Sequence, residues 1–182
     1  MKNTLTTLIL LVTTTLSYSQ KSAFTQFIPD GYILKDSLKC DLNLDGISDY
    51  LLVLKDKNEE VAEIGETLRP IYILEGIKEG GYRLAEKNDS IVLSKNDGGA
   101  FGDPYAGLVA KKNYFSIEQY GGSNWRWSRI YTFKYDQKTK KYYLHKDAGV
   151  SYHTSNPNKV EKLNYHKELW GRIEFKDYLL KN

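Results

Sequence analysis

Short apolar and aromatic segments, separated by turn residues, constrain the fold of this chain most. The 182 residues include 15 tyrosines, 6 phenylalanines and 3 tryptophans, which are residue types that favour β-strands. Residues 50–54 form a nearly continuous apolar run, which is typical of a central strand buried on both faces. The other segments that predict strands are 32–34, 71–74, 82–85, 108–110, 114–120, 129–135 and 141–145. The pattern therefore predicts a mainly β domain.

The connections between these segments predict how the strands are joined. Residues 111–113 and 136–140 are polar and predict two hairpin turns, and residues 147–149 predict a further turn. Evidence for helices is thin. We expect 57–68 to be a loop or one helical turn, 160–169 to be a short helix or an irregular return, and 171–175 to be a final strand.

The length limits the architecture, and the pattern shows a weak division near residue 96. A closed propeller typically needs four or more blades, and this chain could hold about three. We therefore expect a compact antiparallel β-sandwich or an open stack of two blade-like meander sheets, with little helix.

The first 19 residues are typical of a cleaved secretory signal peptide. Lys2 precedes an apolar run from Leu5 to Leu16, and Ser17 and Ser19 fit the positions before a cleavage site at Gln20. The run is shorter than the about 20 residues that span a bilayer, and no later run approaches that length. The alternative is a buried N-terminal strand. We expect an exported protein, periplasmic or extracellular, with one domain over 20–182 and no transmembrane segment in the mature chain.

The net charge bears on whether the protein binds nucleic acid, and the cysteine content bears on whether it contains a disulfide. Lys2 is the one charged residue in 1–19, so cleavage would lower the formal net charge from +3 to +2. This balance predicts no nucleic-acid partner, and we expect a monomer. Cys40 is the only cysteine, so an internal disulfide is excluded. We interpret Cys40 as a buried small apolar side chain rather than a reactive thiol.

Residues 41–52 carry oxygen side chains at the spacing of a calcium-binding loop. Positions 1, 3, 5 and 9 of this segment are acidic or amide residues, position 6 is glycine, and position 7 would supply a backbone carbonyl. The predicted ligands of Ca²⁺ are Asp41, Asn43, Asp45, Ile47 and Asp49. The alternative is an acidic, solvated turn. A metal site would stabilise a domain without disulfides.

Two features separate this loop from an EF-hand. Position 12 is Leu52 rather than glutamate, and the flanking segments predict strands rather than helices. Residues 41–54 resemble instead the calcium loops of FG-GAP or VCBS repeats, which occur in integrin-type propellers and in many secreted bacterial proteins. Cys40 stands where that family commonly has glycine. The resemblance implies a structural calcium site made by Asp41, Asn43, Asp45 and Asp49.

Two glycine-rich stretches, 96–105 and 120–127, predict a ligand-binding surface. If 111–113 is a hairpin turn, both stretches lie at the same edge of the sheet. The predicted ligand-binding residues are Asp97, Asp103, Tyr105, Tyr120, Asn124, Trp125 and Arg126. Such aromatic and polar groups suit a glycan or a peptide. The alternative is structural: Trp125 and Trp127 share a strand face and would both belong to the core, with Arg126 on the solvent side.

No recognisable catalytic set accompanies these residues. The chain lacks a G-x-S-x-G motif, and none of its 3 histidines forms a closely spaced pair, although His145 and His153 would flank the predicted turn at 147–149. The sequence predicts an exported, calcium-stabilised, non-catalytic binding module for a glycan, a peptide or a cell-envelope component. One alternative is an inhibitor or immunity-type protein that binds an exported enzyme. Another is a glycan-acting hydrolase that uses Asp97 and Asp103.

Overall fold

The computed structural model describes residues 24–63 and 65–180. The chain divides into a unit that ends at Asp30 and a unit that begins at Gly31, and the described part of the first contains one 3₁₀ turn, η1 (Thr25–Phe27). The predicted signal peptide, 1–19, lies outside the described residues. Within the described ranges, no helix is long and apolar enough to cross a membrane. All that follows concerns the second unit.

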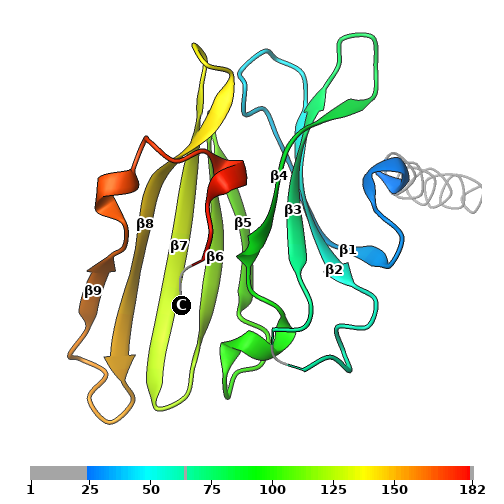
Figure 1. Cartoon of the computed structure of the whole chain (residues 1–182). Helices are drawn as coiled ribbons and strands as arrows, with labels where there is room; N and C mark the ends of the chain where they lie inside the picture. The colour runs from blue at the N-terminus through cyan, green and yellow to red at the C-terminus, as the bar shows by residue number, and fades with distance from the viewer. Residues whose placement is uncertain (1–23, 64, 181–182) are drawn as a thin grey trace, which may run out of the picture. The chain divides into compact units, whose positions relative to one another are not determined.

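The second unit is built from two antiparallel meander sheets (Figure 1). The four-stranded sheet contains β1 (Tyr32–Cys40), β2 (Asp49–Asp56), β3 (Arg69–Gly76) and β4 (Tyr82–Val92). The five-stranded sheet contains β5 (Tyr105–Lys111), β6 (Tyr114–Gly122), β7 (Trp125–Asp136), β8 (Lys141–His153) and β9 (Glu161–Asn164). The chain passes between the sheets at η2 (Lys95–Gly98), close to the expected division. The predicted mainly β fold of two meander sheets is confirmed.

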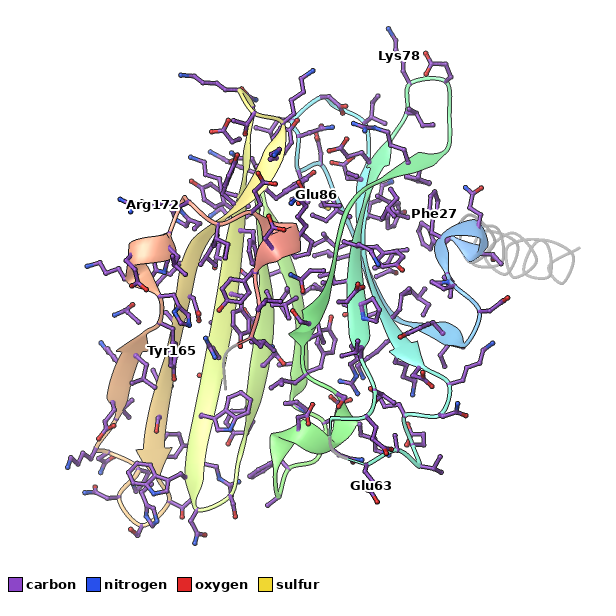
Figure 2. All side chains as sticks on the ribbon, viewed as in Figure 1. Phe27, Glu63, Lys78, Glu86, Tyr165 and Arg172 are labelled. Carbon is purple, nitrogen blue, oxygen red and sulfur yellow. The ribbon has the colours of Figure 1, made fainter. Side chains whose placement is uncertain are left out.

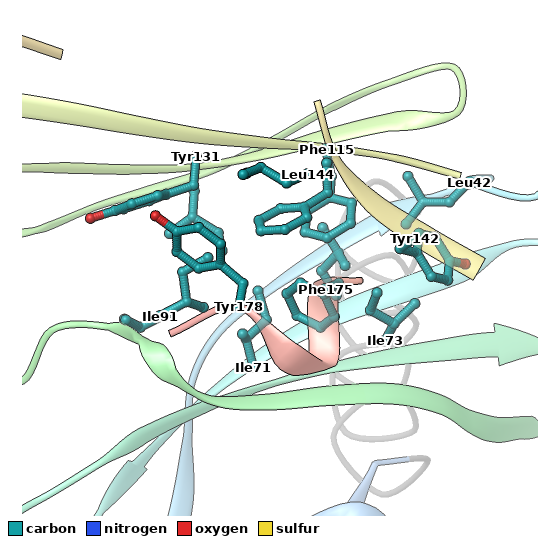
Figure 3. Close-up of a cluster of buried hydrophobic side chains, with 14 of the residues drawn as sticks. Leu42, Ile71, Ile73, Ile91, Phe115, Tyr131, Tyr142, Leu144, Phe175 and Tyr178 are labelled. Carbon is teal, nitrogen blue, oxygen red and sulfur yellow. The ribbon is translucent and has the colours of Figure 1, made fainter. Parts of the chain in front are cut away.

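The hydrophobic core lies between the two sheets (Figure 3). Alternate residues of β2 and β3 face alternate residues of β6, β7 and β8, as the period of a strand requires. Ile71 and Ile73 lie on one side of the core, and Phe115 and Leu144 lie on the other. Burying each such side chain contributes about 1.5–3 kcal/mol. Strands β2 and β3 are buried over residues 49–54 and 69–76, so the continuous apolar run does form a central strand.

The C-terminal segment completes this core. Phe175, in η4 (Phe175–Asp177), packs against Phe115 and Phe133 with ring centroids 5.4 and 5.0 Å apart. The buried amide of Asn88 donates hydrogen bonds to the carbonyls of Phe175 and Tyr178, at 2.6 and 2.7 Å. A side chain on β4 therefore holds a segment almost ninety positions later in the sequence, because its amide satisfies two buried carbonyls.

Three connections differ from the sequence prediction. The turn predicted at 147–149 does not form, because β8 continues to His153 and Gly149 pairs with Arg129 of β7. Asp147 stays in the strand because Arg129 neutralises its carboxylate. Residues 171–175 do not form a strand; Glu174 makes one isolated bridge to Tyr143. Residues 160–169 contain β9 and a 3₁₀ turn, η3 (Lys167–Leu169).

The two predicted hairpins are confirmed. Lys111 pairs with Tyr114 across the β5–β6 turn, and Asp136 pairs with Lys141 across the β7–β8 turn. The carboxylate of Asp136 accepts the backbone N–H groups of Lys138 and Thr139, both at 2.9 Å, which fixes the second turn. The expected loop at 57–68 contains turns and no helix in its described part.

Candidate functional site

The two glycine-rich stretches meet at one end of the five-stranded sheet, as the sequence predicts. Gly99 bridges Gly122, and the N–H of Ala100 donates to the carbonyl of Gly122 at 3.1 Å. Gly122 has a φ of 110°, and a Cβ there would lie 2.0 Å from the carbonyl oxygen of Trp125. Only glycine fits this position, so the close approach of the two stretches depends on it.

Three of the predicted ligand-binding residues are occupied by structural bonds. Asp97 accepts hydrogen bonds from the backbone and the hydroxyl of Ser94, at 2.8 and 2.7 Å, and so caps η2. The hydroxyl of Tyr105 donates to Asp36 of β1 at 2.7 Å. Asp103 bridges Lys35 and Arg69, at 2.8 and 2.6 Å. Asp103 and Tyr105 thus join the two sheets at the β1–β5 edge.

The ion pairs of Asp103 also bear on the hydrolase alternative. Burial alone would raise the pKa of Asp103, but hydrogen bonds from Arg69 and Lys35 outweigh it and hold the pKa at about 2. A general acid for glycoside hydrolysis needs a raised pKa instead. Asp97 is committed to its cap. The geometry therefore does not favour acid–base catalysis by Asp97 and Asp103.

Two other predicted residues, Tyr120 and Arg126, gather with Phe101 and Tyr152 on the outer face of the five-stranded sheet. We call these four residues the Arg126 cluster. The guanidinium carbon of Arg126 lies 3.6 Å from the ring centroid of Phe101, which meets Tyr120 edge-on at 5.5 Å. Tyr152 is directly opposite Arg126 in the β7–β8 ladder, and its hydrogen bond with Tyr120 raises the pKa of Tyr152. One aromatic ring thus lies against the cation, and two tyrosines adjoin it.

The Arg126 cluster differs from the residues above in having exposed aromatic rings and an arginine nitrogen without a hydrogen-bond partner among the described residues. Phe101 is 49% exposed and Tyr120 is 37% exposed, although both are large aromatic side chains. The Nη1 atom of Arg126 is buried and has no hydrogen-bond partner among the described residues. Phe101 was not predicted, although it lies within 96–105, because nothing in its spacing indicates that it stacks on Arg126. Tyr152 was missed because the predicted turn at 147–149 ended its strand too early.

The remaining predicted residues, Asn124 and Trp125, lie at the tip of the β6–β7 hairpin. Trp125 is 55% exposed, and its ring meets that of His153 at 5.2 Å. The carbonyl of Asn124 accepts the N–H of Thr154 at 2.8 Å. Trp127 is half-buried and packs over Gly121, where a Cβ would lie 2.7 Å from the indole. The alternative that both tryptophans belong to the core is therefore wrong for Trp125.

On the other face of β7, Arg129 is fully paired. Its guanidinium forms two hydrogen bonds to Asp147, at 2.8 and 2.7 Å, and lies 4.0 Å from the ring centroid of Tyr165. Burial acts against the charge, but the bonds to Asp147 outweigh it and raise the pKa of Arg129. Tyr178 donates its hydroxyl to the same carboxylate at 2.5 Å. A cavity of roughly 260 Å³ adjoins this network, lined by Trp127, Tyr131 and Tyr165 among others.

The predicted calcium loop is a tight turn in which side-chain oxygens accept backbone N–H groups. Asp41 accepts from Asp45 and Gly46 at 3.2 and 3.1 Å, Asn43 accepts from Asp45 at 3.0 Å, and Asp45 accepts from Ile47 at 2.8 Å. Gly46 has a φ of 82°, as the turn requires. These oxygens are of the type that calcium prefers, and one hydrogen bond does not exhaust the lone pairs of an oxygen.

Asp49 has a different place from the other predicted ligands. It is fully buried, and its two oxygens accept the N–H groups of Leu42 and Gly76, at 2.8 and 3.0 Å. Burial raises the pKa of Asp49 although these bonds act against the rise. Within the described ranges, no three His, Cys, Asp or Glu side chains gather closely enough to hold a metal ion. Asp41 and Asn43 are half-buried and Asp45 is exposed, whereas Asp49 anchors the loop to β3 through Gly76.

Cysteine and histidine chemistry receives no support from the structure. Cys40 packs against the core, and burial followed by the charges of Asp49 and Asp41 raises the pKa of its thiol to about 12. The thiol therefore stays protonated at neutral pH, and Cys40 behaves as a small apolar side chain. His145 lies against Tyr114 at 4.9 Å, whereas His153 lies against Trp125. The two histidines do not face each other.

A shallow groove runs along the outer face of β7, β8 and β9, next to the Arg126 cluster. It has a volume of roughly 450 Å³. Ser128 and Val150 line one end, and they lie two residues from Arg126 and Tyr152 on the same strand faces. The groove and the cluster are therefore continuous along β7 and β8.

Comparison with known proteins gives no relative from which a function could be transferred. The similarity of residues 41–54 to FG-GAP or VCBS loops thus stays a prediction. No family model, no curated protein and no solved structure matches this chain.

Proposed function

We propose that this protein is an exported, non-catalytic binding module whose ligand lies on the Arg126 cluster. The ligand would be a glycan, a peptide or another component of the cell envelope. The observation that carries the proposal is the state of Arg126: its Nη1 is buried without a partner, under an exposed phenylalanine ring.

An unpaired, buried guanidinium nitrogen is costly for a protein that has no use for it. Leaving a buried donor unsatisfied costs about 1–3 kcal/mol. The cation–π contact with Phe101 stabilises the folded protein by about 0.5–2 kcal/mol, but it gives the N–H group no acceptor. A bound ligand with an oxygen atom at Nη1 would accept this hydrogen bond and so remove the cost of the unsatisfied donor.

The surroundings of Arg126 suit recognition. Aromatic side chains at such a surface supply apolar contact area at low entropic cost, and the hydroxyls of Tyr120 and Tyr152 add polar groups that can orient a ligand. The site is built on paired strands and on the Gly99–Gly122 junction, so its residues are held in place before a ligand arrives. Such preorganisation increases affinity because little freedom is lost on binding.

Calcium would have a separate, structural role in this proposal. Asp41, Asn43 and Asp45 would hold the ion, and the ion would replace the missing disulfides as a source of stability. The loop connects β1 to β2 in the four-stranded sheet, whereas the Arg126 cluster belongs to the five-stranded sheet. Ligand binding would therefore not require the metal to contact the ligand.

The proposal can be tested with a panel of defined probes and a matched pair of variants. The probes are muropeptides, neutral cello-oligosaccharides, oligogalacturonates and an acidic peptide, each titrated by calorimetry. We expect Arg126→Gln to weaken the binding of the recognised probe at least about tenfold, which corresponds to about 1.4 kcal/mol. Arg172→Gln, on an exposed residue of the C-terminal segment (Figure 2), should bind like the parent protein.

Three results would contradict the proposal. The first is that no probe binds. The second is that both arginine variants bind as tightly as the parent protein. The third is chemical turnover of a probe, which would show an enzyme. A stable equimolar complex with an exported enzyme, lost in Arg126→Gln, would replace the envelope ligand by an inhibitory function.

A further inference from the structure

The groove beside the Arg126 cluster carries positive charge without an opposing charge. Lys146 and Lys162 belong to its lining, and the lining contains no Asp or Glu. The apolar part of its floor is formed by Ile130, Ala148 and Val150. Glu118 lies opposite Ile130 in the β6–β7 ladder, but it is outside the lining. With Arg126 beyond one end, the groove and the cluster together present three cations, and the carboxylate of Glu118 lies beside this path; the excess of positive charge favours an anionic ligand.

The groove is long enough for an extended chain. From Thr132 to Arg126 the outer face of β7 covers six residues, or about 20 Å at the rise of a β-strand. Lys146 pairs with Thr132 at one end of this path, and Lys162 pairs with Val150 nearer the other end. The positive groups are thus spread along the path instead of gathered at one point. A polymer with regularly repeated charges would match this spacing better than a single small anion.

The floor of the groove argues against a peptide that adds as a strand. Strands β7 and β8 are central, with β6 on one side and β9 on the other, and β9 pairs with β8 over residues 148–151, where the groove lies. A peptide that binds by strand addition needs a free sheet edge. This floor presents side chains instead, including the hydroxyls of Ser128 and Thr132 and the amide of Asn164. Hydroxyl and amide groups both donate and accept, which suits the hydroxyls of sugars.

We propose that the groove and the Arg126 cluster together bind a carboxylate-bearing polysaccharide. The inference rests on the proposed function and names the ligand class of the same surface. Lys146 and Lys162 would attract successive carboxylates, Arg126 would bind one carboxylate through its unpaired Nη1, and Phe101 would contact a sugar ring. Exposed lysines contribute mainly charge, whereas the guanidinium adds directional hydrogen bonds.

The test compares an oligogalacturonate with its methyl-esterified form, which has the same backbone without the charges. We expect the free acid to bind at least tenfold more tightly than the ester. The double variant Lys146→Gln/Lys162→Gln should weaken binding of the acid at least tenfold and should reduce its dependence on ionic strength. The control is Lys57→Gln/Lys78→Gln, which removes the same charge from exposed positions that flank the four-stranded sheet and should bind like the parent protein.

The outcomes separate this inference from the proposed function. If the acid does not bind, or binds no better than the ester, the inference fails. The proposed function still stands if Arg126→Gln weakens binding of another probe. If an acidic peptide binds as tightly as the acid with the same dependence on the two lysines, the ligand class is wrong. If both double variants weaken binding equally, the groove is not the site, and general charge attraction explains the result.

Discussion

Arg126 and Arg129 lie on opposite faces of the same strand, and their surroundings are opposite in kind. Arg129 faces the interior and forms two hydrogen bonds to a fully buried carboxylate. Arg126 faces outward, stacks on an exposed ring and keeps a buried nitrogen without a partner. Both guanidinium groups contact aromatic rings, so the difference lies in the carboxylate. The paired arginine holds the fold together, whereas the unpaired nitrogen of Arg126 is the group that we propose a ligand would bind.

The largest effect is expected when Arg129, the paired arginine, is replaced. Arg129→Gln leaves the carboxylate of Asp147 buried with only the hydroxyl of Tyr178 to compensate it. We expect the free energy of unfolding to fall by about 3–5 kcal/mol, as measured by urea denaturation. Arg126→Gln should change it by less than about 1 kcal/mol, because the lost contact with Phe101 is offset by the removal of an unsatisfied buried donor. Equal losses in the two variants would show that Arg126 is also a structural residue.

The predicted calcium loop extends the comparison to acceptors, because its side-chain oxygens accept hydrogen bonds and still have free lone pairs. With a dissociation constant of about 10⁻⁴–10⁻³ M, about 10 mM calcium should stabilise the protein by about 1.4–2.7 kcal/mol. Asp45→Ala should abolish this gain in a thermal unfolding experiment. The control Asp89→Ala, in which β4 loses a partly exposed carboxylate, should keep it. If calcium and a chelator give the same unfolding temperature in the parent protein, the loop is an acidic turn.

Glu86 extends the comparison to an acidic side chain. One oxygen of its carboxyl group, Oε2, is buried and has no hydrogen-bond partner among the described residues, and a proton can satisfy that oxygen. Oε2 of Glu174, in contrast, lies 3.4 Å from the Nζ of Lys176. Figure 2 shows Glu86 close to the C-terminal segment. Burial, followed by the charge of Glu174, raises the pKa of Glu86 to about 7, although Lys176 and Lys141 oppose the rise. The ordinary value is 4.5, so the folded protein binds this proton more tightly than the unfolded chain does.

Because the pKa of Glu86 is raised on folding, the stability of the protein should fall as the pH rises. The stability that Glu86 contributes is complete below about pH 4.5 and is lost as the pH rises through about 7. Because Glu86 is half-buried, solvent screening reduces the effect to on the order of 1 kcal/mol. We expect the parent protein to lose this much more stability than Glu86→Gln between about pH 5 and about pH 8. Glu79→Gln, at an exposed turn, should follow the parent; a Glu86→Gln profile parallel to the parent would refute the assignment.

The sequence predicted the fold well because the fold depends on local pattern. Alternation and apolar runs located the strands, polar turns located two hairpins, and the hairpin at 111–113 placed the two glycine-rich stretches together. The errors occurred where a distant partner changes the meaning of a residue. Asp147 has the pattern of a turn residue, but Arg129 keeps it in β8. Residues 171–175 alternate like a strand, but Phe175 enters the core as part of a 3₁₀ turn.

The candidate site was predicted less completely, for the same reason. Asp97, Asp103 and Tyr105 have the chemistry of ligand-binding residues, but Ser94, Arg69 and Asp36 already use that chemistry. Tyr120 and Arg126 remain available on the outer face. The list of residues thus located the region correctly but did not separate the side chains used in structural bonds from those on the outer face.

Chain order and residue type were sufficient for the β architecture, the turns, the glycine junction and the acidic loop, because these depend on neighbours a few positions apart. The division of the polar residues between structure and surface needed the folded chain. Hydrogen bonds such as those from Arg69 to Asp103 and from Arg129 to Asp147 join residues far apart in sequence. A charged side chain becomes structural or available according to whether a partner meets it in the folded chain, either between the sheets or on a neighbouring strand, and no local pattern encodes that meeting.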